Sequence, residues 1–224
     1  MKNQNTSREF SIVNAALLPD MSRRDLIKGA GLTLAVLGGG SLLTACASGD
    51  AKGGPLTATQ YLRIDTDGTV TVISPQTELG QGAYTGLATL AAEELDADWS
   101  KVKVEGAPAD VKLFGNPAFG GALQGTGGSS TAPAFWEPMR KAGATARAML
   151  VAAAAADWGV PAAEITVKNG VVSHAGKNKS AAFGELVGAA SKQAAPKEVK
   201  LKDPKDFTLI GQPAKRVDAH AKST

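Results

Sequence analysis

Two different periods of apolar residues follow one another along this chain, and their order constrains the fold more than any other feature. Alternating apolar residues on both sides of Asp67-Gly68 predict a β-hairpin, because glycine readily supplies the positive φ of a tight turn. The same pattern around Asn169-Gly170 predicts a second hairpin. Antiparallel strands are therefore expected in two separate parts of the chain.

Between and after the hairpins, apolar residues recur at helical spacing. The sequence predicts, in chain order, a hairpin, a helix, a strand, a long loop, a helix, a hairpin and a helix, at residues 61–73, 83–97, 102–105, 106–131, 133–158, 165–174 and 183–191. This order indicates an α+β fold in which helices pack on a mixed sheet. In the first helix, Leu87, Leu90 and Leu95 form the apolar stripe, while Glu93 and Glu94 are predicted to face solvent.

Residues 1–45 have the composition of an export signal. Arg23, Arg24 and Lys28 precede a weakly apolar run over 29–45, and this pattern resembles a bacterial twin-arginine signal peptide. The run is shorter than the ~20 apolar residues that a membrane span needs. The alternative is an amphipathic helix of the folded domain, but three consecutive glycines disfavour it at ~1 kcal/mol each.

The chain's only cysteine, Cys46, directly follows this run. With Leu43, Thr44 and Ala45 before it, the site resembles the lipobox of bacterial lipoproteins. This resemblance predicts lipidation of Cys46 and a periplasmic protein anchored to a membrane. An incidental small residue near an ordinary cleavage site is the alternative. Small and polar residues then predict a flexible tether over 46–59.

A single cysteine also limits the chemistry of the chain. It cannot form an internal disulfide, a four-cysteine zinc site or an iron–sulfur cluster, so redox chemistry needs a cofactor or a partner.

Residues 192–224 carry eight Lys and Arg against four Asp and Glu. Because Phe207 is their single aromatic residue, they predict a solvated tail and no nucleic-acid surface.

The sequence contains no pattern typical of a hydrolase. His174 and His220 are 46 positions apart and neither adjoins a nucleophile, so both are predicted to have plain surface roles. No His-Glu-x-x-His, Ser-His-Asp or phosphate-loop pattern occurs. The sequence therefore predicts no catalytic residue and no metal ligand in this chain.

Two glycine-rich turns, each directly before a predicted helix, are the candidate binding sites. They span 78–82 and 124–131. Glycine lets a ligand approach the backbone, and the N–H groups at the start of the following helix can bind it. Gln81 adds an amide donor and acceptor, and small hydroxyl residues such as Ser129 suit a phosphate or a polar heterocycle. Taken alone, each turn is equally typical of a tight turn with a helix cap.

Several segments together resemble one family, the large, molybdopterin-binding subunit of the xanthine dehydrogenase superfamily. The closest resemblance is to exported isoquinoline 1-oxidoreductase and membrane aldehyde dehydrogenase large subunits. The segments are 78–82, 91–95, 126–131, 136–144, 156–161 and 202–211, so the resemblance covers nearly all of 60–219. It implies that 60–191 form part of a molybdenum cofactor-binding domain. The implied cofactor is molybdopterin, which could be a cytosine dinucleotide, shared with a partner chain.

The resemblance also implies the binding residues. The stretch matching Leu79 to Gly82 contacts the pterin, and Gln81 hydrogen-bonds to it. The stretch matching Thr126 to Thr131 lies along the pterin and its phosphate tail. The implied cofactor-binding residues are Leu79, Gly80, Gln81, Gly82, Thr126, Gly127, Gly128, Ser129, Ser130 and Thr131.

Length is the main departure from the family. Members are several times longer, and their catalytic glutamate, a second glycine-rich loop and the hammerhead domain match nothing here, so 192–224 are expected to be a tail towards a missing hammerhead domain. Glu78, Glu93 and Glu94 match no catalytic motif. The resemblance implies oxidation of aldehydes or N-heterocycles, with the chain inactive alone. The implied partners are the remaining part of the large subunit, an iron–sulfur small subunit and often a cytochrome. The alternatives are a non-catalytic periplasmic lipoprotein for binding or assembly, and a truncated product.

Overall fold

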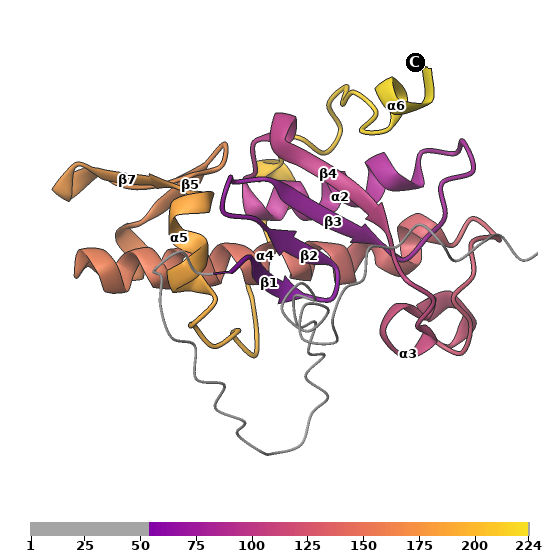
Figure 1. Ribbon diagram of the computed structural model, residues 1–224, viewed down its shortest axis with the longest axis horizontal. Helices are drawn as coiled ribbons and strands as arrows, with labels where there is room; N and C mark the ends of the chain where they lie inside the picture. The colour runs from indigo at the N-terminus through magenta and orange to yellow at the C-terminus, as the bar shows by residue number, and fades with distance from the viewer. Residues whose placement is uncertain (1–53, 224) are drawn as a thin grey trace, which may run out of the picture. The chain divides into compact units, whose positions relative to one another are not determined.

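The computed structural model describes residues 54–223. The predicted export signal, Cys46 and most of the predicted tether lie outside this range. The described part contains two β-sheets, a long helix and several shorter helices (Figure 1). Of the helices between residues 54 and 223, none has both the length and the apolar character to span a membrane.

The first sheet has four strands, and neighbours pair antiparallel except for β3 and β4, which run parallel. The sheet is therefore mixed, as predicted. Its strands are β1 (Leu56–Thr59), β2 (Leu62–Ile64), β3 (Val70–Ser74) and β4 (Val102–Gly106). The first predicted hairpin is β2 with β3. In contrast, β1 lies within the range predicted as a tether, because a single large apolar residue, the buried Leu56, gave no visible alternation.

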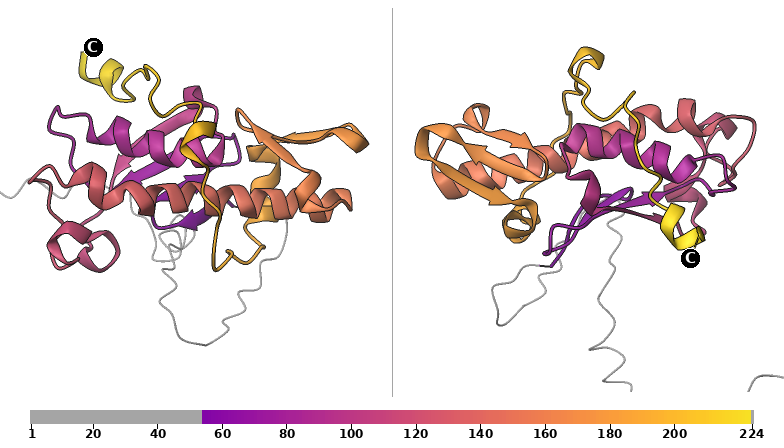
Figure 2. Two further views of the ribbon diagram at one scale, coloured as in Figure 1. Left: turned by 180° about the vertical axis from the view of Figure 1, so that it is seen from behind. Right: turned by 90° about the horizontal axis from the view of Figure 1, so that it is seen from above.

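Helices α2 (Ala83–Leu95) and α4 (Thr131–Trp158) lie side by side on one face of this sheet (Figure 2). The chain passes from β3 through α2 to the parallel strand β4, while α4 packs against α2, β1 and β2. The residues buried between the helices and the sheet include Ile64, Leu87, Leu95, Phe135, Met139 and Leu150. Both helices were expected from their spacing, although α4 begins two residues earlier than predicted.

The second sheet is antiparallel and contains β5 (Thr166–Lys168), β6 (Val171–His174) and β7 (Lys179–Ala182). Strands β5 and β6 form the second predicted hairpin, with Asn169 and Gly170 both at positive φ. Strand β7 is absent from the prediction, because its residues do not alternate between apolar and polar. The short helix α5 (Phe183–Ala190) follows, as expected.

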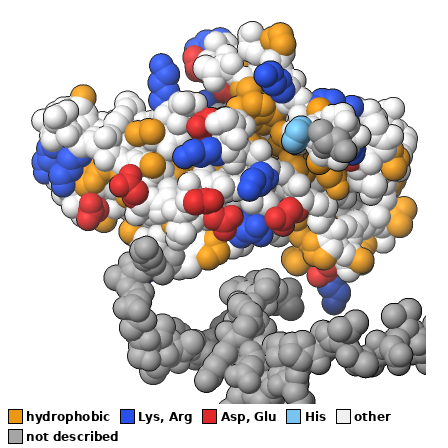
Figure 3. Space-filling model, turned by 45° about the horizontal axis from the view of Figure 1, so that its top comes forward, with side chains coloured by type: hydrophobic (Ala, Val, Ile, Leu, Met, Phe, Trp, Pro, Cys, Tyr) orange, Lys and Arg blue, Asp and Glu red, His pale blue; other side chains and the backbone are white. Residues whose placement is uncertain are grey.

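The remaining elements are short. Loop 106–131 contains α3 (Val111–Phe114) and a 3₁₀ helix at Pro117–Phe119. Helix α6 spans Ala219–Ser223, and further 3₁₀ helices span Trp99–Lys101, Ala162–Glu164, Ala175–Lys177 and Pro204–Asp206. Basic and acidic side chains are interspersed on the face of the molecule in Figure 3.

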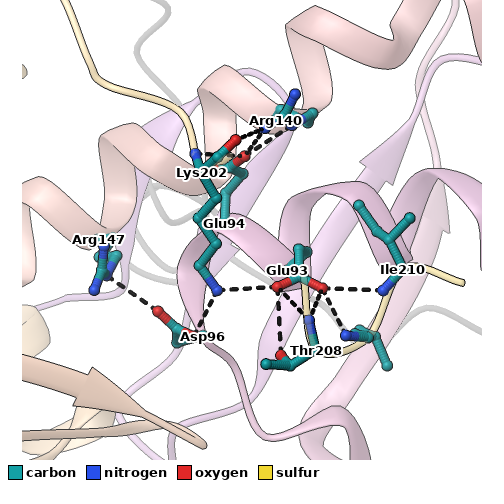
Figure 4. Close-up of polar contacts among 9 residues, drawn as sticks. Glu93, Glu94, Asp96, Arg140, Arg147, Lys202, Thr208 and Ile210 are labelled. Carbon is teal, nitrogen blue, oxygen red and sulfur yellow. Dashed lines mark hydrogen bonds and ion pairs between the residues drawn. The ribbon is translucent and has the colours of Figure 1, made fainter. Parts of the chain in front are cut away.

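Glu93 and Glu94 are buried, so the prediction that they face solvent was wrong. Each residue is 1% exposed. Their carboxylates bind residues of a C-terminal segment, 202–218, that we call the strap (Figure 4). The segment predicted as a solvated tail is thus fixed to the helices by these contacts, although none of its residues is buried.

Glu93 binds the middle of the strap. Its carboxylate accepts hydrogen bonds from the backbone N–H groups of Thr208, Leu209 and Ile210 at 3.0, 2.6 and 3.0 Å. The ammonium group of Lys202 lies 3.0 Å away. Burial raises the pKa of Glu93, but the N–H groups of Ile210 and Leu209 together with Lys202 outweigh burial and lower the pKa overall.

Glu94 joins the start of the strap to helix α4. Its Oε1 lies 2.7 Å from Nε and 2.6 Å from Nη2 of Arg140, and it accepts a hydrogen bond from the Lys202 N–H through Oε2 at 3.0 Å. Nη2 of Arg140 also donates to the Lys202 carbonyl at 2.6 Å. The guanidinium group lies over the rings of Trp136 and Phe207, 5.3 and 5.1 Å from their centroids. One cluster therefore connects α2, α4 and the strap.

Acid should release the strap from α2. Because the pKa of Glu93 is lowered by folding, its contribution to stability is complete above the unfolded pKa of ~4.3 and is lost as the pH falls through the lower folded-state pKa. Amide hydrogen exchange at pH 7 and pH 3, corrected for intrinsic rates, measures this release. Residues 208–210 should lose protection before Val171–His174, and retained protection of 208–210 at pH 3 would contradict the assignment.

His174 has a structural role inside the protein, which corrects its predicted surface role. The residue is 4% exposed. Its Nδ1 accepts a hydrogen bond from the Lys177 N–H at 2.9 Å, so Nε2 carries the proton and donates to Glu164 at 2.9 Å. The imidazole thus holds the turn after β6. The sequence argument considered only whether His174 adjoins a nucleophile, and it gave no sign of this contact. His220 is exposed, as expected.

Candidate functional site

The carboxyl ends of the parallel strands β3 and β4 border a hollow of about 580 Å³. Open sheets with parallel strands commonly bind ligands at this edge. The lining includes Gln76, Thr77, Tyr84, Leu123 and Thr126, which come from the end of β3, the start of α2 and loop 106–131. Thr126 belongs to the predicted cofactor-binding set.

In the first glycine-rich turn, the side chain of Glu78 occupies the start of α2. Its carboxylate accepts hydrogen bonds from the N–H groups of Gly80, Gly82 and Tyr84 at 2.7, 3.0 and 3.1 Å. The Glu78 side chain is only 2% exposed and lies 3.1 Å from Nη2 of Arg216 in the strap. Burial raises the pKa of Glu78, but the three N–H groups and the Arg216 charge outweigh it and lower the pKa overall. This role of Glu78 is absent from the sequence prediction.

Gln81 folds back onto its own turn. Its Oε1 accepts a hydrogen bond from the Leu79 N–H at 2.6 Å, and its Nε2 donates to the Thr77 carbonyl at 2.9 Å. Both ends of the amide that was expected to bind a pterin are therefore engaged within the protein. Each end makes one hydrogen bond, so one N–H of Nε2 and one lone pair of Oε1 remain for a ligand on this exposed side chain. Leu79 beside it is 72% exposed.

The second turn bends sharply before α4. Gly128 and Ser129 have positive φ values of 58° and 54°, and Ser130 then adopts a right-handed conformation at the helix start. A step between these two conformations directs successive N–H groups to one side and suits an anion. Gly127, Gly128 and Ser129 are exposed, whereas Ser130 is buried and its hydroxyl donates to the Gly127 carbonyl at 2.8 Å. The first three can therefore face a ligand, and Ser130 stabilises the turn.

Two buried amides, Gln76 and Asn116, hold the second turn in place. Gln76 donates to the Gly125 carbonyl and accepts from the Thr131 hydroxyl, both at 3.2 Å. Asn116 donates to the Gly125 carbonyl at 3.0 Å and to the Ser130 hydroxyl at 2.8 Å. Neither amide is in the sequence prediction. For Gln76, the available signal was a polar amide that directly follows a buried strand and a proline.

The two turns meet at one edge of the sheet. The Thr77 N–H donates to the Thr126 hydroxyl oxygen at 2.8 Å, which links the residue before the first turn to the second turn. A Cβ added at Gly80, Gly82 or Gly127 would meet nothing within 4 Å, so the backbone there is open to an approaching group. The exposed backbone of Gly127, Gly128 and Ser129 and the exposed Gln81 amide are the polar groups that this edge offers to a ligand. Among residues 54–223, no three His, Cys, Asp or Glu side chains are placed to hold a metal ion.

A family model described as the molybdopterin cofactor-binding domain matches residues 18–222. The chain belongs to this family. The predicted membership of the xanthine dehydrogenase superfamily is thereby confirmed, and the α+β architecture with its mixed sheet agrees with a part of such a domain.

Three curated relatives are similar to this molybdopterin-binding chain. The beta subunit of isoquinoline 1-oxidoreductase from Brevundimonas diminuta is 41% identical over 171 residues, which is 75% of this chain and 22% of the relative. Membrane-bound aldehyde dehydrogenase (pyrroloquinoline-quinone) of Gluconacetobacter polyoxogenes is 35% identical over 76% of this chain and 22% of the relative. A nicotinate dehydrogenase subunit of Pseudomonas putida is 31% identical over 73% of this chain and 13% of the relative.

The chain thus spans at most about a fifth of the length of these relatives. Among solved structures, quinoline 2-oxidoreductase from Pseudomonas putida 86 is similar, with a TM-score of 0.41 and 29% identity. The match covers 57% of this chain and 15% of that protein.

Proposed function

We propose that this chain supplies part of the molybdopterin site of a molybdenum hydroxylase that oxidises aldehydes or N-heterocycles with water as the oxygen source. The observation that carries this proposal is the meeting of the two glycine-rich turns at the edge of β3 and β4, through the contact between Thr77 and Thr126. The names of the relatives, which include an aldehyde dehydrogenase and oxidoreductases of N-heterocycles, support the substrate classes.

In this proposal, the residues of the chain bind and orient the cofactor. The exposed backbone of Gly127, Gly128 and Ser129 binds the phosphate end, and the Gln81 amide binds the pterin through the N–H and the lone pair that its own turn leaves open. The bound molybdenum cofactor supplies the two-electron oxidation chemistry, and its phosphate end could carry a cytosine nucleotide. The buried amides Gln76 and Asn116 keep the second turn fixed while the cofactor binds.

We further propose that the chain is inactive alone. The catalytic glutamate would come from the remaining part of the large subunit, and electrons would pass to an iron–sulfur small subunit and often to a cytochrome. Two of the relatives are named as subunits, which supports an assembly of several chains. Residues 60–191 would then be the cofactor-binding part, and 192–224 would lead towards the hammerhead domain.

Metal and pterin analysis of the purified protein tests this function. The chain is produced with and without the product of the neighbouring gene, and molybdenum and pterin are measured per chain. We expect both only in the pair, and we expect Gly127→Val to reduce them roughly tenfold, equivalent to ~1.4 kcal/mol of binding free energy. This valine would fill the space where the backbone is open to the cofactor.

Gly54→Val is the matched control, because it adds the same side chain at another exposed glycine with open surroundings, away from the site. It should leave molybdenum and pterin unchanged. A protein that contains neither molybdenum nor pterin in any combination, or a Gly127→Val variant loaded like wild type, would contradict the proposal.

The proposal includes export through the twin-arginine route and a lipid anchor on Cys46. The support is the sequence pattern before and at Cys46. Fractionation of cells that produce Cys46→Ser tests the anchor: release from the membrane fraction is expected, and unchanged membrane association would rule it out.

A further inference from the structure

The strap follows helix α2 over almost its whole length. At the end of α2, the Lys202 ammonium group binds Asp96 at 2.6 Å, the residue directly after the helix. In the last two turns of α2, Glu93 binds the strap backbone at 208–210. Near the start of α2, the Val217 N–H donates to the Thr85 hydroxyl oxygen at 3.2 Å. The strap therefore delivers its residues 216–218 to the first glycine-rich turn.

Arg216 uses this position to bind the turn in two ways. Its Nη1 donates to the Gly80 carbonyl at 3.2 Å, and its Nη2 donates to Glu78 at 3.1 Å. Asp218 also binds the guanidinium group, with contacts of 3.2 Å to Nε and 3.3 Å to Nη2, and it forms an ion pair with Lys222 at 2.5 Å. These contacts with Arg216 and Lys222 lower the pKa of Asp218 to about 2, so this carboxylate stays charged under ordinary conditions.

We infer that Arg216 and Glu78 are positioning residues for the cofactor turn 78–82, an inference that rests on the proposed function. Glu78 collects the N–H groups of Gly80, Gly82 and Tyr84 on one carboxylate, and Arg216 fixes that carboxylate and the Gly80 carbonyl at the same time. The backbone of the turn is thereby held from both its donor and its acceptor side. The Gln81 amide bonds to the backbone of the same turn, so its orientation is then set before any cofactor arrives.

The contacts of Arg216 favour a local role over a contribution to global stability. The Arg216 side chain is 41% exposed, and the buried Glu78 carboxylate keeps its three N–H donors when Arg216 is removed, so this ion pair should add little to the free energy of unfolding. Arg216 acts locally through its planar guanidinium group, which can bind a carbonyl and two carboxylates in fixed directions. A lysine ammonium group cannot reproduce this geometry. Loss of Arg216 should therefore loosen the turn while the rest of the described structure stays intact.

The test compares Arg216→Gln, Arg216→Lys and Glu78→Gln with Lys205→Gln as the matched control. Lys205 lies in the same strap, in an exposed pair with Asp203 in which the two side chains are 75% and 55% exposed. Two measurements are made on the full chain: amide hydrogen exchange without cofactor, and molybdenum and pterin content after production with the neighbouring gene product. Melting temperatures are recorded for every variant.

We expect Arg216→Gln to speed exchange of the Gly80, Gly82 and Tyr84 amides roughly tenfold, to lower cofactor content by a similar factor, and to leave the melting temperature and exchange in Val171–His174 unchanged. Arg216→Lys should change exchange and cofactor content less than Arg216→Gln does, because lysine keeps the charge but lacks the planar guanidinium group. Glu78→Gln should mainly speed exchange of the Tyr84 amide, since the single amide oxygen of glutamine cannot replace both carboxylate oxygens. Lys205→Gln should behave as wild type.

Wild-type exchange at these amides in Arg216→Gln overturns the inference, and so does wild-type cofactor content in that variant. A wild-type protein without molybdenum and pterin overturns the proposed function instead. In that case the exchange result alone decides whether Arg216 positions the turn.

Discussion

Replacing Glu94 with alanine is expected to lower the free energy of unfolding by about 3 to 5 kcal/mol, the range for removing one partner of a buried ion pair. The Glu94 and Arg140 side chains are 1% and 8% exposed, so the variant would leave a guanidinium charge buried without its carboxylate. The Lys202 N–H would lose its acceptor as well. Urea denaturation followed by circular dichroism measures the change, and residues 202–210 should exchange faster in the variant.

Glu137→Ala is the control for this prediction. Glu137 also forms an ion pair on a helix, with Lys141, but the Lys141 and Glu137 side chains are 56% and 63% exposed. Such an exposed pair contributes less than ~1 kcal/mol. If Glu94→Ala costs no more than Glu137→Ala, the buried pair does not join α2, α4 and the strap as the contacts indicate.

Sequence reasoning succeeded where structure is decided by near neighbours. Asp67-Gly68 and Asn169-Gly170 lie in the connections of the two predicted hairpins, where Gly68, Asn169 and Gly170 have the positive φ that a tight turn needs. The apolar stripe of α2 depends equally on residues within one helix, so the helix was found almost to its ends. The membership of the molybdopterin-binding family followed from motifs of the same local kind.

The same reasoning failed for Glu93 and Glu94, and the cause lies at long range. A glutamate on the polar side of a helix normally faces water, and nothing near these two residues says otherwise. Their partners in the strap lie more than 100 positions further along, and Arg140 lies 46 positions after Glu94. Burial of a carboxylate becomes favourable only once those N–H groups surround it. Reading each helix by itself therefore assigns such residues to solvent.

For the candidate site, the turns themselves were predicted but their supports were not. Sequence reasoning located 78–82 and 124–131 from their glycines, whereas Gln76 and Asn116 belong to no glycine-rich motif. It named Gln81 for its amide donor and acceptor, but it could not show that each end of this amide makes a hydrogen bond within the turn. Which polar groups remain open to a ligand depends on the folded backbone of the turn, and the residue types alone do not determine it.

Replacing Gly143 with alanine is expected to destabilise the fold by about 2 to 3 kcal/mol, within the range for overpacking a close contact. Gly143 lies on α4 where this helix crosses α2, and an added Cβ would overlap the Ala91 carbonyl oxygen and press on Glu94 Cβ at 3.0 Å. Both neighbours are part of α2 and cannot rotate away, so the two helices would have to separate along the main core contact. Thermal or urea unfolding measures the loss.

Gly86→Ala is the same chemical change, but it is expected to raise the stability of the fold. Gly86 is exposed on α2, and a Cβ there would meet nothing within 4 Å, so alanine should stabilise the helix by up to ~1 kcal/mol through its higher helix propensity. The two variants share the gain in helix propensity, and their difference therefore isolates the contact between α4 and α2. Equal stability of the two variants would mean that the helices can move apart at little cost. A large difference would mean that the absence of a side chain at Gly143 is needed for the close approach of α4 to α2 at Ala91 and Glu94.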